Sequence, residues 1–519
     1  MHPFLERHAD DVLGMVSGFD RLRLRGTLRR IANAQGMGSF LTQQHVLLKD
    51  FGEYVQDATA RVKQATEAVA TAHGRPVLFV SRPSADKEAI VREIVARDRI
   101  EAGLICVLKS VELCWSFDVH RNRTTKHLDL VAARRKCLHY YHYQVHPQLG
   151  FLHTRLQSWF PFTMHVGLNG REWLARQLDA HGLGYRRRGN CFVWLEDVAA
   201  TQQLADAQLR TAWEPLLNAL AASTNPAHAA LFDAFPLWYY WSAEQSEWAS
   251  DVLFKAARRL DALYPPLVAH AMTQLGSRDV MRFLGKRVPA VGIDGCFRGE
   301  VVSDVVARPE GVRVKHRVNG NAVKMYNKQG SVLRVETVIN TARDLKVYRP
   351  KEGDPGGEKT WRYLRKGIAD TWRRAELSQQ ANERYLAALA AVAEPTPLGT
   401  LSQPLCRRVR YQGQPLRALN PLAADDAALL AIVYRGEFVI SGLRNRDVRR
   451  LLYPGTSDLP TRRRRAAQVT RQLRLLRGHG LLRKVPHTHR YLLTAKGRVV
   501  VAALLAARQA DTATLAAAA

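Results

Sequence analysis

The sequence predicts a multidomain α+β protein, with an α/β N-terminal part, a mixed α+β centre containing β-rich hairpins, and a helical C-terminal module. Three observations lead to this prediction. The chain has 519 residues, which corresponds to three or four domains at roughly 100–200 residues each. Segments that alternate like strands are interspersed with segments of helical spacing. Basic residues concentrate in a run of helical segments near the C-terminal end.

Composition narrows the class of partner. Hydrophobic residues make up 46% of the chain and the mean hydropathy is −0.24, which is typical of a chain that can bury a core. The formal net charge is +30, from 77 Lys and Arg against 47 Asp and Glu. A surplus of this size favours a polyanionic partner, because each basic contact to a phosphate releases counterions. We therefore expect nucleic acid, with an acidic membrane surface or a ribosome-like partner as alternatives.

The sequence also argues against membrane and extracellular roles. No segment approaches the roughly 18 consecutive apolar residues that a membrane span requires, and the N-terminus has acids and no signal-type apolar core. The six cysteines form no Cys-x-x-Cys pair, which disfavours a disulfide framework or a structural zinc site. We expect a cytoplasmic protein that does not bind membranes.

Residues 1–135 are predicted to form the α/β domain. Local patterns predict, in chain order, a strand that turns helical over 18–31, a helix over 56–74, a strand over 75–80, a helix over 84–98 with Ser84 as N-cap, and a strand over 102–111.

Residues 136–393 are predicted to form the central α+β domain. Its elements are extended segments from 137, a helix over 169–182 opened by Asn169 and closed by Gly182, a strand over 191–195, a long helix over 196–223, a helical stretch over 249–287, and a β-rich region over 291–349. Seven of the ten Trp lie between 159 and 248, which we interpret as core packing. A Pro- and Thr-rich stretch predicts a linker over 394–421, and a low-complexity tail over 508–519 is expected to be disordered.

Residues 422–507 carry the clearest functional signal. Three helical segments are followed by two extended segments and a final helix, and residues 444–484 hold 13 Lys and Arg against two acids. The third helix is apolar at Ala467, Val469, Leu473 and Leu476. The side chains predicted to contact DNA are Arg462, Arg463, Arg464, Arg465, Gln468, Arg471 and Arg474 on this helix, and Lys484, His487 and His489 in the turn after it.

This order of elements resembles the winged-helix variant of helix-turn-helix domains. The resemblance implies that the third helix reads double-stranded DNA and that the turn around His487-Thr488-His489 forms the wing. A winged helix used for protein contacts is the alternative. We prefer a phosphate or backbone contact to a metal site for the two histidines.

A central segment, "VKMYNKQGSVLRVETVIN" over 323–340, carries candidate chemistry. Its Tyr326-Asn327-Lys328 and Leu333-Arg334-Val335-Glu336 resemble a segment of rolling-circle replication-initiation proteins. The resemblance implies DNA nicking with Tyr326 as nucleophile, Lys324, Lys328 and Arg334 neutralising phosphate, and a divalent metal, Mg²⁺ or Mn²⁺, bound by Glu336. Asn327 stands where Asp is common, and the His-hydrophobic-His metal motif of one branch is absent.

Tyr348 is a rival nucleophile, because Tyr-x-x-Lys is a spacing found in such nickases. The chain as a whole resembles a widespread type of bacterial protein, a resemblance that implies no mechanism.

Further metal ligands are predicted in "YYWSAEQSEWASDVLF" over 239–254. Glu247 and Asp251 lie four apart, so on a helix they share one face and could bind a metal together with Glu336. A salt-bridged or solvated pair is the alternative. Asp20 and Asp118 could be the first carboxylates of a ribonuclease-H-like core, without a spacing that separates this from chance. We interpret His139, His142, His146 and His153 as a polar strand face rather than a zinc site.

The register of the predicted hairpin decides whether its residues meet. A two-residue Gln-Gly loop pairs Tyr326 with Leu333 and puts Lys324, Tyr326 and Lys328 on the face opposite Arg334 and Glu336. A loop longer or shorter by one residue brings both sets to one face.

Together these patterns predict a DNA-binding protein of a mobile element or replicon. It would process DNA strands by metal-dependent nicking or strand transfer, as a replication initiator or a transposase-like enzyme. We expect double-stranded DNA as its partner, with single-stranded DNA as a further candidate. A non-catalytic regulator or replication accessory protein is the main alternative, and an RNA-binding or RNA-processing protein is a third.

Overall fold

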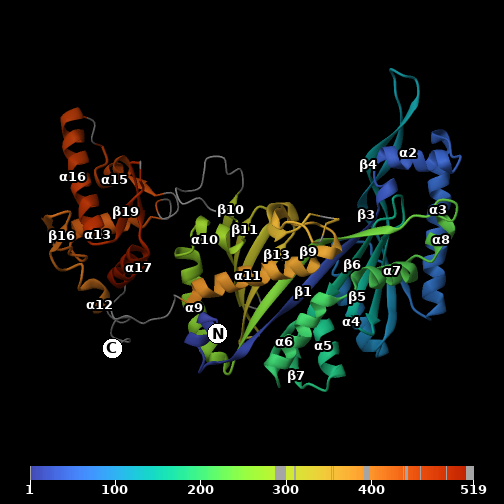
Figure 1. The fold of residues 1–519 in the computed structure, drawn as a ribbon, viewed down its shortest axis with the longest axis horizontal. Coiled ribbons are helices and arrows are strands. Elements are labelled where there is room, and N and C mark those ends of the chain that lie inside the picture. The colour runs from blue at the N-terminus through green and yellow to red at the C-terminus, as the bar shows by residue number, and fades with distance from the viewer. Residues whose placement is uncertain are drawn as a thin grey trace. The chain divides into compact units, whose positions relative to one another are not determined.

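The computed structural model describes residues 2–286, 300–308, 311–351, 353–354, 356–390, 398–435, 438, 442–455, 458–486 and 488–509. The fold is mixed α+β and divides into two compact units (Figure 1). The first unit comprises residues 1–264, 283–286 and 303–387, and the second comprises the remaining residues.

A single mixed sheet of eleven strands organises the first unit. Its strands, in spatial order, are β10 (Val301–Arg308), β11 (Gly311–Val318), β12 (Asn321–Lys328), β13 (Val332–Ile339), β9 (Tyr239–Phe254), β1 (Val12–Leu28), β6 (Met164–Asn169), β5 (Gly150–Gln157), β4 (Leu128–His146), β3 (Gly103–Arg121) and β2 (Val77–Phe79). The pairs from β11 to β3 are antiparallel, and β2 runs parallel to β3.

Strand β1 lies in the interior of this sheet, between β6 and β9. The expected strand over 18–31 therefore exists, and its alternation buries Phe19, Leu22 and Leu24. The boundary predicted at residue 135 falls inside β4, and strands from both sides of it belong to one sheet. The N-terminal strand is thus part of the same layer as the central β-rich region.

Helices cover both faces of the sheet around β9 and β13. On one face, α5 (Gly170–Ala180) and α6 (Val198–Ala207) pack against β1. On the other, α11 (Thr371–Leu389) lies across the strands (Figure 1), where Trp248 Nε1 donates to Gln379 Oε1 at 2.8 Å. The predicted caps of α5 are confirmed, because the Asn169 side chain accepts from Arg171 N and Glu172 N.

The other helices of this part of the chain surround the aromatic core or end the unit. They are α1 (Pro3–Arg7), α2 (Ala34–Gln43), α3 (Phe51–Ala72), α4 (Lys87–Asp98), α7 (Trp213–Thr224) and α8 (Ala227–Leu231). Helix α9 (Ala257–Thr273) begins in the first unit, but its residues from Pro265 on and most of α10 (Ser277–Phe283) belong to the second unit. Trp173, Trp213, Trp241 and Trp248 are buried in the main core, as the Trp-rich segment predicted.

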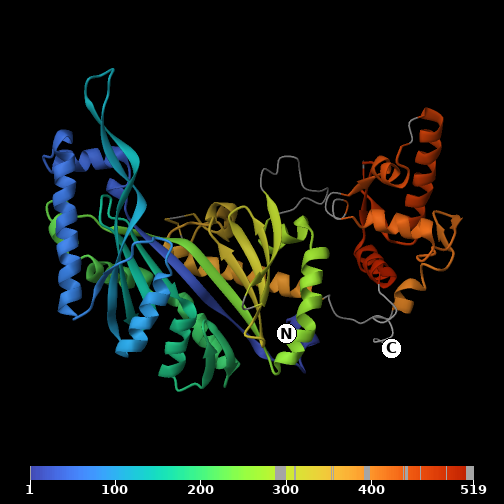
Figure 2. The ribbon, with the colours of Figure 1, turned by 180° about the vertical axis from the view of Figure 1, so that it is seen from behind.

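Three hairpins complete the first unit. Strands β7 (Tyr185–Arg188) and β8 (Cys191–Leu195) form one, and β14 (Lys346–Arg349) and β15 (Thr360–Tyr363) form another. The third is the long β3–β4 pair, whose far end extends beyond the sheet as a twisted two-stranded ribbon (Figure 2).

The second unit contains a three-stranded sheet of order β18–β20–β19, surrounded by helices. Its elements are α12 (Leu398–Ser402), β16 (Val409–Tyr411), β17 (Gln414–Leu416), α13 (Ala424–Val433), β18 (Leu443–Arg444), α15 (Asn445–Leu452), α16 (Leu459–Gly478), β19 (Leu482–Lys484), β20 (Arg490–Leu493) and α17 (Ala495–Gln509). On α16, Val469, Leu473, Leu475 and Leu476 are buried, whereas Ala467, which was expected inside, is exposed.

Four sequence-based expectations were wrong in detail. Residues 239–254 form strand β9, so the helix expected there and the helical start at 249 are absent. The long helix over 196–223 is broken into α6 and α7. Asp86, not Ser84, caps α4. The described part of the linker predicted over 394–421 contains α12 and the β16–β17 hairpin, and buries Leu405 and Leu419 in the second unit's core. Of the predicted tail, residues 510–519 lie outside the described residues.

Candidate metal centre

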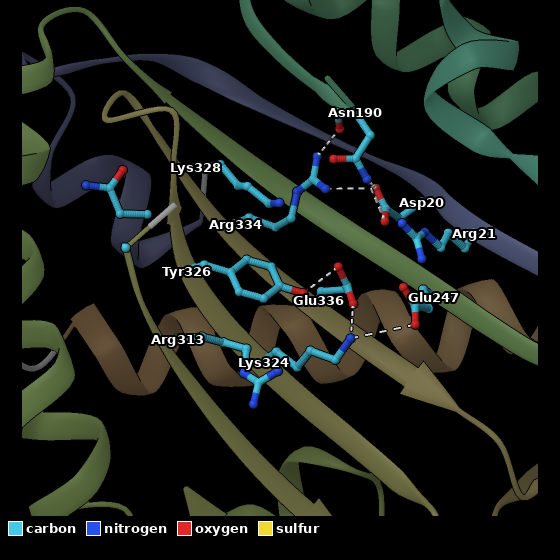
Figure 3. Close-up of a pocket in the computed structure, with 12 residues that line it drawn as sticks. Asp20, Arg21, Asn190, Glu247, Arg313, Lys324, Tyr326, Lys328, Arg334 and Glu336 are labelled. Carbon is cyan, nitrogen blue, oxygen red and sulfur yellow. Dashed lines mark hydrogen bonds and ion pairs between the residues drawn. The ribbon is translucent and has the colours of Figure 1, made fainter. Parts of the chain in front are cut away.

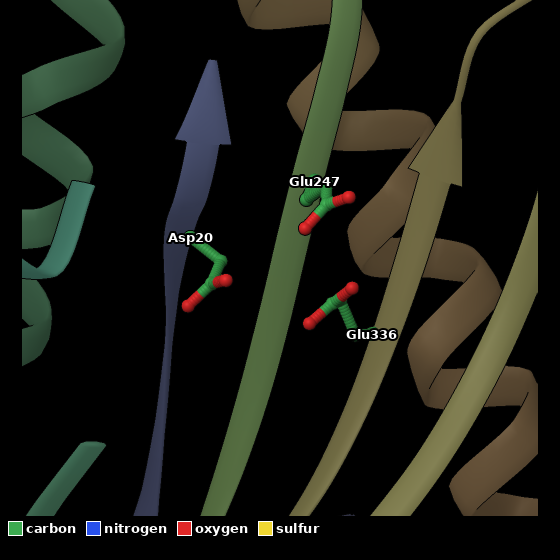
Figure 4. A group of neighbouring side chains, drawn as sticks. All are labelled: Asp20, Glu247 and Glu336. Carbon is green, nitrogen blue, oxygen red and sulfur yellow. The ribbon is translucent and has the colours of Figure 1, made fainter. Parts of the chain in front are cut away.

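Three carboxylates from three neighbouring strands converge on one face of the sheet (Figure 4). Asp20 comes from β1, Glu247 from β9 and Glu336 from β13, and one oxygen from each lies within 4.8 Å of the others. In the ranges that the structure describes, no other group of three or more His, Cys, Asp or Glu side chains is arranged in this way. The sheet thus brings together acids that are far apart in the sequence.

Strand pairing explains why these side chains share a face. Glu336 pairs with Ala249, two residues from Glu247, and side chains two apart on a strand point to the same side. Glu247 pairs with Arg21 and Trp248 with Phe19, which leaves Asp20 as the extra residue of a β-bulge. A bulge re-aims side chains, and here both Asp20 and Arg21 line the same cavity.

The register of the β12–β13 hairpin brings a fourth strand to the centre. Tyr326 pairs with Arg334, Lys324 with Glu336, and Lys328 with Val332. The loop is therefore Gln329-Gly330-Ser331, one residue longer than the two-residue loop considered first, and Gln329 and Gly330 have φ of 55° and 75°. The two-residue register is wrong, and the shifted register places all of the predicted hairpin residues on one face.

Glu336 is bonded by two side chains of β12 (Figure 3). Lys324 Nζ lies 2.6 Å from Glu336 Oε1, and the Tyr326 hydroxyl donates to Glu336 Oε2 at 2.7 Å. Lys324 Nζ also lies 3.6 Å from Glu247 Oε1. One ammonium group therefore bridges two of the three carboxylates.

Asp20 is held from the other side by a buried arginine. Arg334 Nη1 lies 2.7 Å from Asp20 Oδ1, and Asn190 Nδ2 donates to both Asp20 oxygens at 2.9 and 3.1 Å. Arg334 also donates to Asn190 O at 2.8 Å, and this hydrogen bond links the turn of the β7–β8 hairpin to the three acids. Arg334, expected to neutralise phosphate, instead holds acids inside the protein.

Asp251, predicted as a metal ligand, has a different role. Arg334 Nε and Nη2 bond its two oxygens at 2.6 and 2.9 Å, and Arg171 Nη2 lies 3.0 Å from Oδ2. Two buried guanidinium groups thus occupy this carboxylate, which corresponds to the salt-bridged alternative. The three carboxylates that the structure brings within 4.8 Å of one another are Asp20, Glu247 and Glu336, and the predicted Asp251 is not among them.

The pKa values of the acids are pushed apart. Burial, followed by the charge of Glu336, raises the pKa of Glu247 to about 7. Burial also raises the pKa of Asp20, against the opposing charge of Arg334. Burial acts the same way on Glu336, but Lys324 and Arg334 outweigh it and hold the pKa of this carboxyl below its usual value. Glu247 therefore titrates near neutral pH, as expected for a buried carboxyl beside another carboxylate.

The acids line a cavity of about 430 Å³ whose other walls are basic (Figure 3). The lining residues are Asp20, Arg21, Asn190, Glu247, Gly311, Arg313, Lys324, Tyr326, Asn327, Lys328, Arg334 and Glu336. The predicted residues Lys324, Tyr326, Lys328, Arg334, Glu247 and Glu336 are thus brought together. Burial and the charge of Glu336 raise the pKa of Tyr326 well above its ordinary value, so its hydroxyl stays protonated.

Tyr348, the rival nucleophile, does not line this cavity; it lies on β14 and is exposed. Sequence reasoning missed Arg171 and Asn190 as partners of the acids. It noted Asp20 in "GFDRLRLRG", but no local pattern linked Asp20 to Glu247, because the link is a pairing between distant strands.

The residues predicted to contact DNA lie mostly on α16, in the second unit. Arg462, Arg463, Arg464 and Arg471 are exposed, and Arg465, Gln468 and Arg474 are half-buried. Arg465 lies over the Tyr453 ring and donates to Gln468 at 3.0 Å. Lys484 and His489 are exposed, and His487 lies outside the described residues.

No family model matches the chain, and no curated protein or solved structure matches it. Within the described ranges, no helix is both long and apolar enough to cross a lipid bilayer.

Proposed function

We propose that the protein is a divalent-metal-dependent enzyme that nicks or transfers DNA strands, as part of a mobile element or replicon. The observation that carries this proposal is the triad of Asp20, Glu247 and Glu336 inside a basic cavity. Carboxylates on adjacent strands supply the negative charge that a cation needs, and the surrounding bases supply the positive charge that a phosphodiester needs.

The donor set fits a hard cation. All three ligands are carboxylates, which suit Mg²⁺ or Mn²⁺ better than softer metals. Three acids lie within 4.8 Å of one another; burial raises the pKa of Glu247 to about 7, and repulsion by the charge of Glu336 adds to the shift. A bound metal would relieve the repulsion, polarise a phosphoryl oxygen and lower the pKa of a water molecule.

Water is the nucleophile that the geometry favours. Tyr326 is buried and its hydroxyl donates a hydrogen bond to Glu336, and its raised pKa disfavours the phenolate that attack would require. We assign Tyr326 the role of orienting Glu336. Arg21, Arg313 and Lys328 line the cavity and are placed to neutralise the phosphates of a bound strand.

The second unit supports duplex DNA as the substrate. Helices α13, α15 and α16 are followed by the β19–β20 pair, an order that supports a winged helix. Strand β18, which precedes α15, joins this pair in a small sheet. The basic residues at the start of α16, Arg462 to Arg464, are exposed and so are available for phosphate and base contacts. We therefore propose that this unit recognises the DNA target.

One observation favours a second candidate, a non-catalytic DNA-binding regulator or replication accessory protein. Lys324 already supplies a cation to Glu336 and Glu247, at 2.6 and 3.6 Å. If this ion pair is permanent, the centre stabilises the sheet and binds no metal. The two candidates differ in whether a divalent cation displaces Lys324.

Incubation of the purified protein with supercoiled plasmid and Mg²⁺ or Mn²⁺ tests the proposal. We expect conversion to open circle or rearranged product, lost in Glu247→Gln and in Glu336→Gln. Glu244→Gln is the matched control, because Glu244 lies on the same strand, is half exposed and pairs with His165 at 3.6 Å. Duplex binding with no cleavage, and no Mn²⁺-dependent rise in melting temperature, would select the regulator.

Replacing Tyr326 by Phe tests the choice of nucleophile. Cleavage that persists in Tyr326→Phe supports water. Loss of cleavage, together with a covalent protein–DNA adduct in the wild type, would instead select the tyrosine mechanism.

A further inference from the structure

The outward face of the β14–β15 hairpin is made of aromatic rings. Tyr348, Trp361 and Tyr363 expose 60%, 68% and 60% of their surface. Large aromatic side chains are usually buried, and a cluster of exposed rings marks an interaction site. This face lies in the first unit and does not line the metal centre.

Strand pairing builds this face. Tyr348 pairs with Trp361, and Lys346 pairs with Tyr363, so two cross-strand pairs present their side chains to solvent. The intervening residue Val347 is buried in a small core with Ile339, Ala342, Leu345 and Leu364. The hairpin is therefore anchored by its inner face, and its outer face is free to contact a ligand.

The rings are arranged side by side with cations among them. The Tyr348 and Trp361 centroids are 5.7 Å apart with a tilt of 55°, and Lys346 Nζ lies 5.1 Å from the Tyr363 ring. Trp372, at the start of α11, is 43% exposed and carries the Arg373 guanidinium 4.3 Å above its ring. Exposed rings with cations beside them suit a ligand that has both flat faces and negative charge.

The surrounding segment is basic. Residues 343–373 contain nine Lys and Arg against five acids. Two of those acids are already paired: Asp370 bonds Arg365 at 2.9 Å and Arg373 at 2.6 Å, and Asp344 lies 3.7 Å from Lys286. Of the nine bases, Arg365 and Arg373 belong to these pairs and Arg349 is buried. The other six Lys and Arg still outnumber the other three acids, and this surplus complements a polyanion.

We propose that the face formed by Tyr348, Trp361 and Tyr363 binds single-stranded DNA by stacking unpaired bases on its rings. Bases in a duplex hide their flat faces, so exposed rings select a single strand, and stacking tolerates any base sequence. Lys346 and the neighbouring basic residues contact the phosphates. The choice of DNA over RNA rests on the proposed function, in which a nicked duplex releases a single strand. Tyr348 is thereby assigned to stacking rather than to nucleophilic attack.

Fluorescence anisotropy with labelled oligo(dT) of roughly 15 nucleotides tests the proposal. The full-length protein is used in EDTA, with excess unlabelled duplex to occupy the second unit. Loss of one stacking ring is expected to weaken binding about 5- to 150-fold, so Trp361→Ala and Tyr363→Ala should each show a loss in this range. Trp361→Phe and Tyr363→Phe keep a ring and should bind within about threefold of wild type.

Trp238→Ala is the matched control, because Trp238 is 73% exposed and lies outside the hairpin. It should bind oligo(dT) like the wild type. Unchanged affinity in both Trp361→Ala and Tyr363→Ala would overturn the proposal, and so would binding of oligo(rU) without binding of oligo(dT). Because EDTA removes metal, this readout is independent of cleavage. Ring-dependent oligo(dT) binding without plasmid nicking would overturn the proposed enzyme and leave the stacking face supported.

Discussion

Replacing Arg334 by methionine is expected to destabilise the first unit, because Arg334 holds the acids of the centre together. Its side chain is completely buried and makes four hydrogen bonds, two to Asp251, one to Asp20 and one to Asn190 O. Methionine fills a similar volume but donates nothing. Asp20 and Asp251, whose side chains are 4% and 2% exposed, would lose a buried counter-charge.

Breaking a buried ion pair by removing one partner costs about 3–5 kcal/mol. The first unit has about 350 residues, so its unfolding entropy is about 0.7 kcal/mol per kelvin. The expected drop in melting temperature is therefore about 4–7 °C. The loss should be larger at high pH, because Asp20, whose pKa is already raised by burial, can take up a proton at low pH and so shed its charge.

Thermal and urea denaturation in EDTA measure this loss. Arg313→Met is the control, since Arg313 lies 3.4 Å from a partly exposed Asp304 and should cost at most about 1 kcal/mol. Adding Asp20→Asn to Arg334→Met should recover stability, with a coupling energy of about 0.5–3 kcal/mol between the two sites. A loss below about 1 kcal/mol for Arg334→Met, or strict additivity in the double variant, would refute this account of the centre.

Three further predictions follow from the same structure. The pKa of Glu247 is raised to about 7, so its stabilising protonated form is lost as the pH rises through that value, and below it a bound cation must displace a proton. The Mn²⁺ affinity measured by calorimetry should therefore fall about tenfold from pH 8 to pH 6. An affinity that does not change with pH would contradict the assignment of Glu247 as a ligand. Replacing Arg462 to Arg465 by Ala should abolish specific duplex binding and reduce the slope of log affinity against log salt by about 3–4, which binding at two salt concentrations measures. Gly170→Ala should lower the free energy of unfolding, measured by urea denaturation, by about 1–3 kcal/mol and should weaken Mn²⁺ binding, because the added Cβ would collide with Phe19 O beside the Asp20 bulge. Gly38→Ala is the control, because a Cβ there meets nothing within 4 Å and should change neither quantity.

Local patterns were sufficient for many individual elements. The helix after Asn169 and the strands at β1, β8 and the β12–β13 hairpin follow from spacing and turn residues, which act over a few positions. The same holds for the order of helices and extended segments after residue 422. The spacing of Glu247 and Asp251 did not distinguish strand β9 from a helix, because residues four apart share a face in a strand and in a helix alike. The prediction that Glu247 and Asp251 share a face therefore also holds for the strand.

The composition of the centre required the tertiary structure. Glu336 and its neighbours on the hairpin were foreseen, but whether they met depended on one loop residue, since a shift by one position moves every side chain to the other face. Asp20 lies in the cluster with Glu247 and Glu336 because β1 pairs with β9 through a bulge, whereas Asp251 is paired with Arg334 and Arg171. The sequence by itself determined the basic charge, the local elements and the candidate acids. Which acids meet was decided by pairing between distant strands, β1 with β9 more than two hundred residues apart and β9 with β13 about 90 apart. That pairing depends on burial and register that no local pattern records.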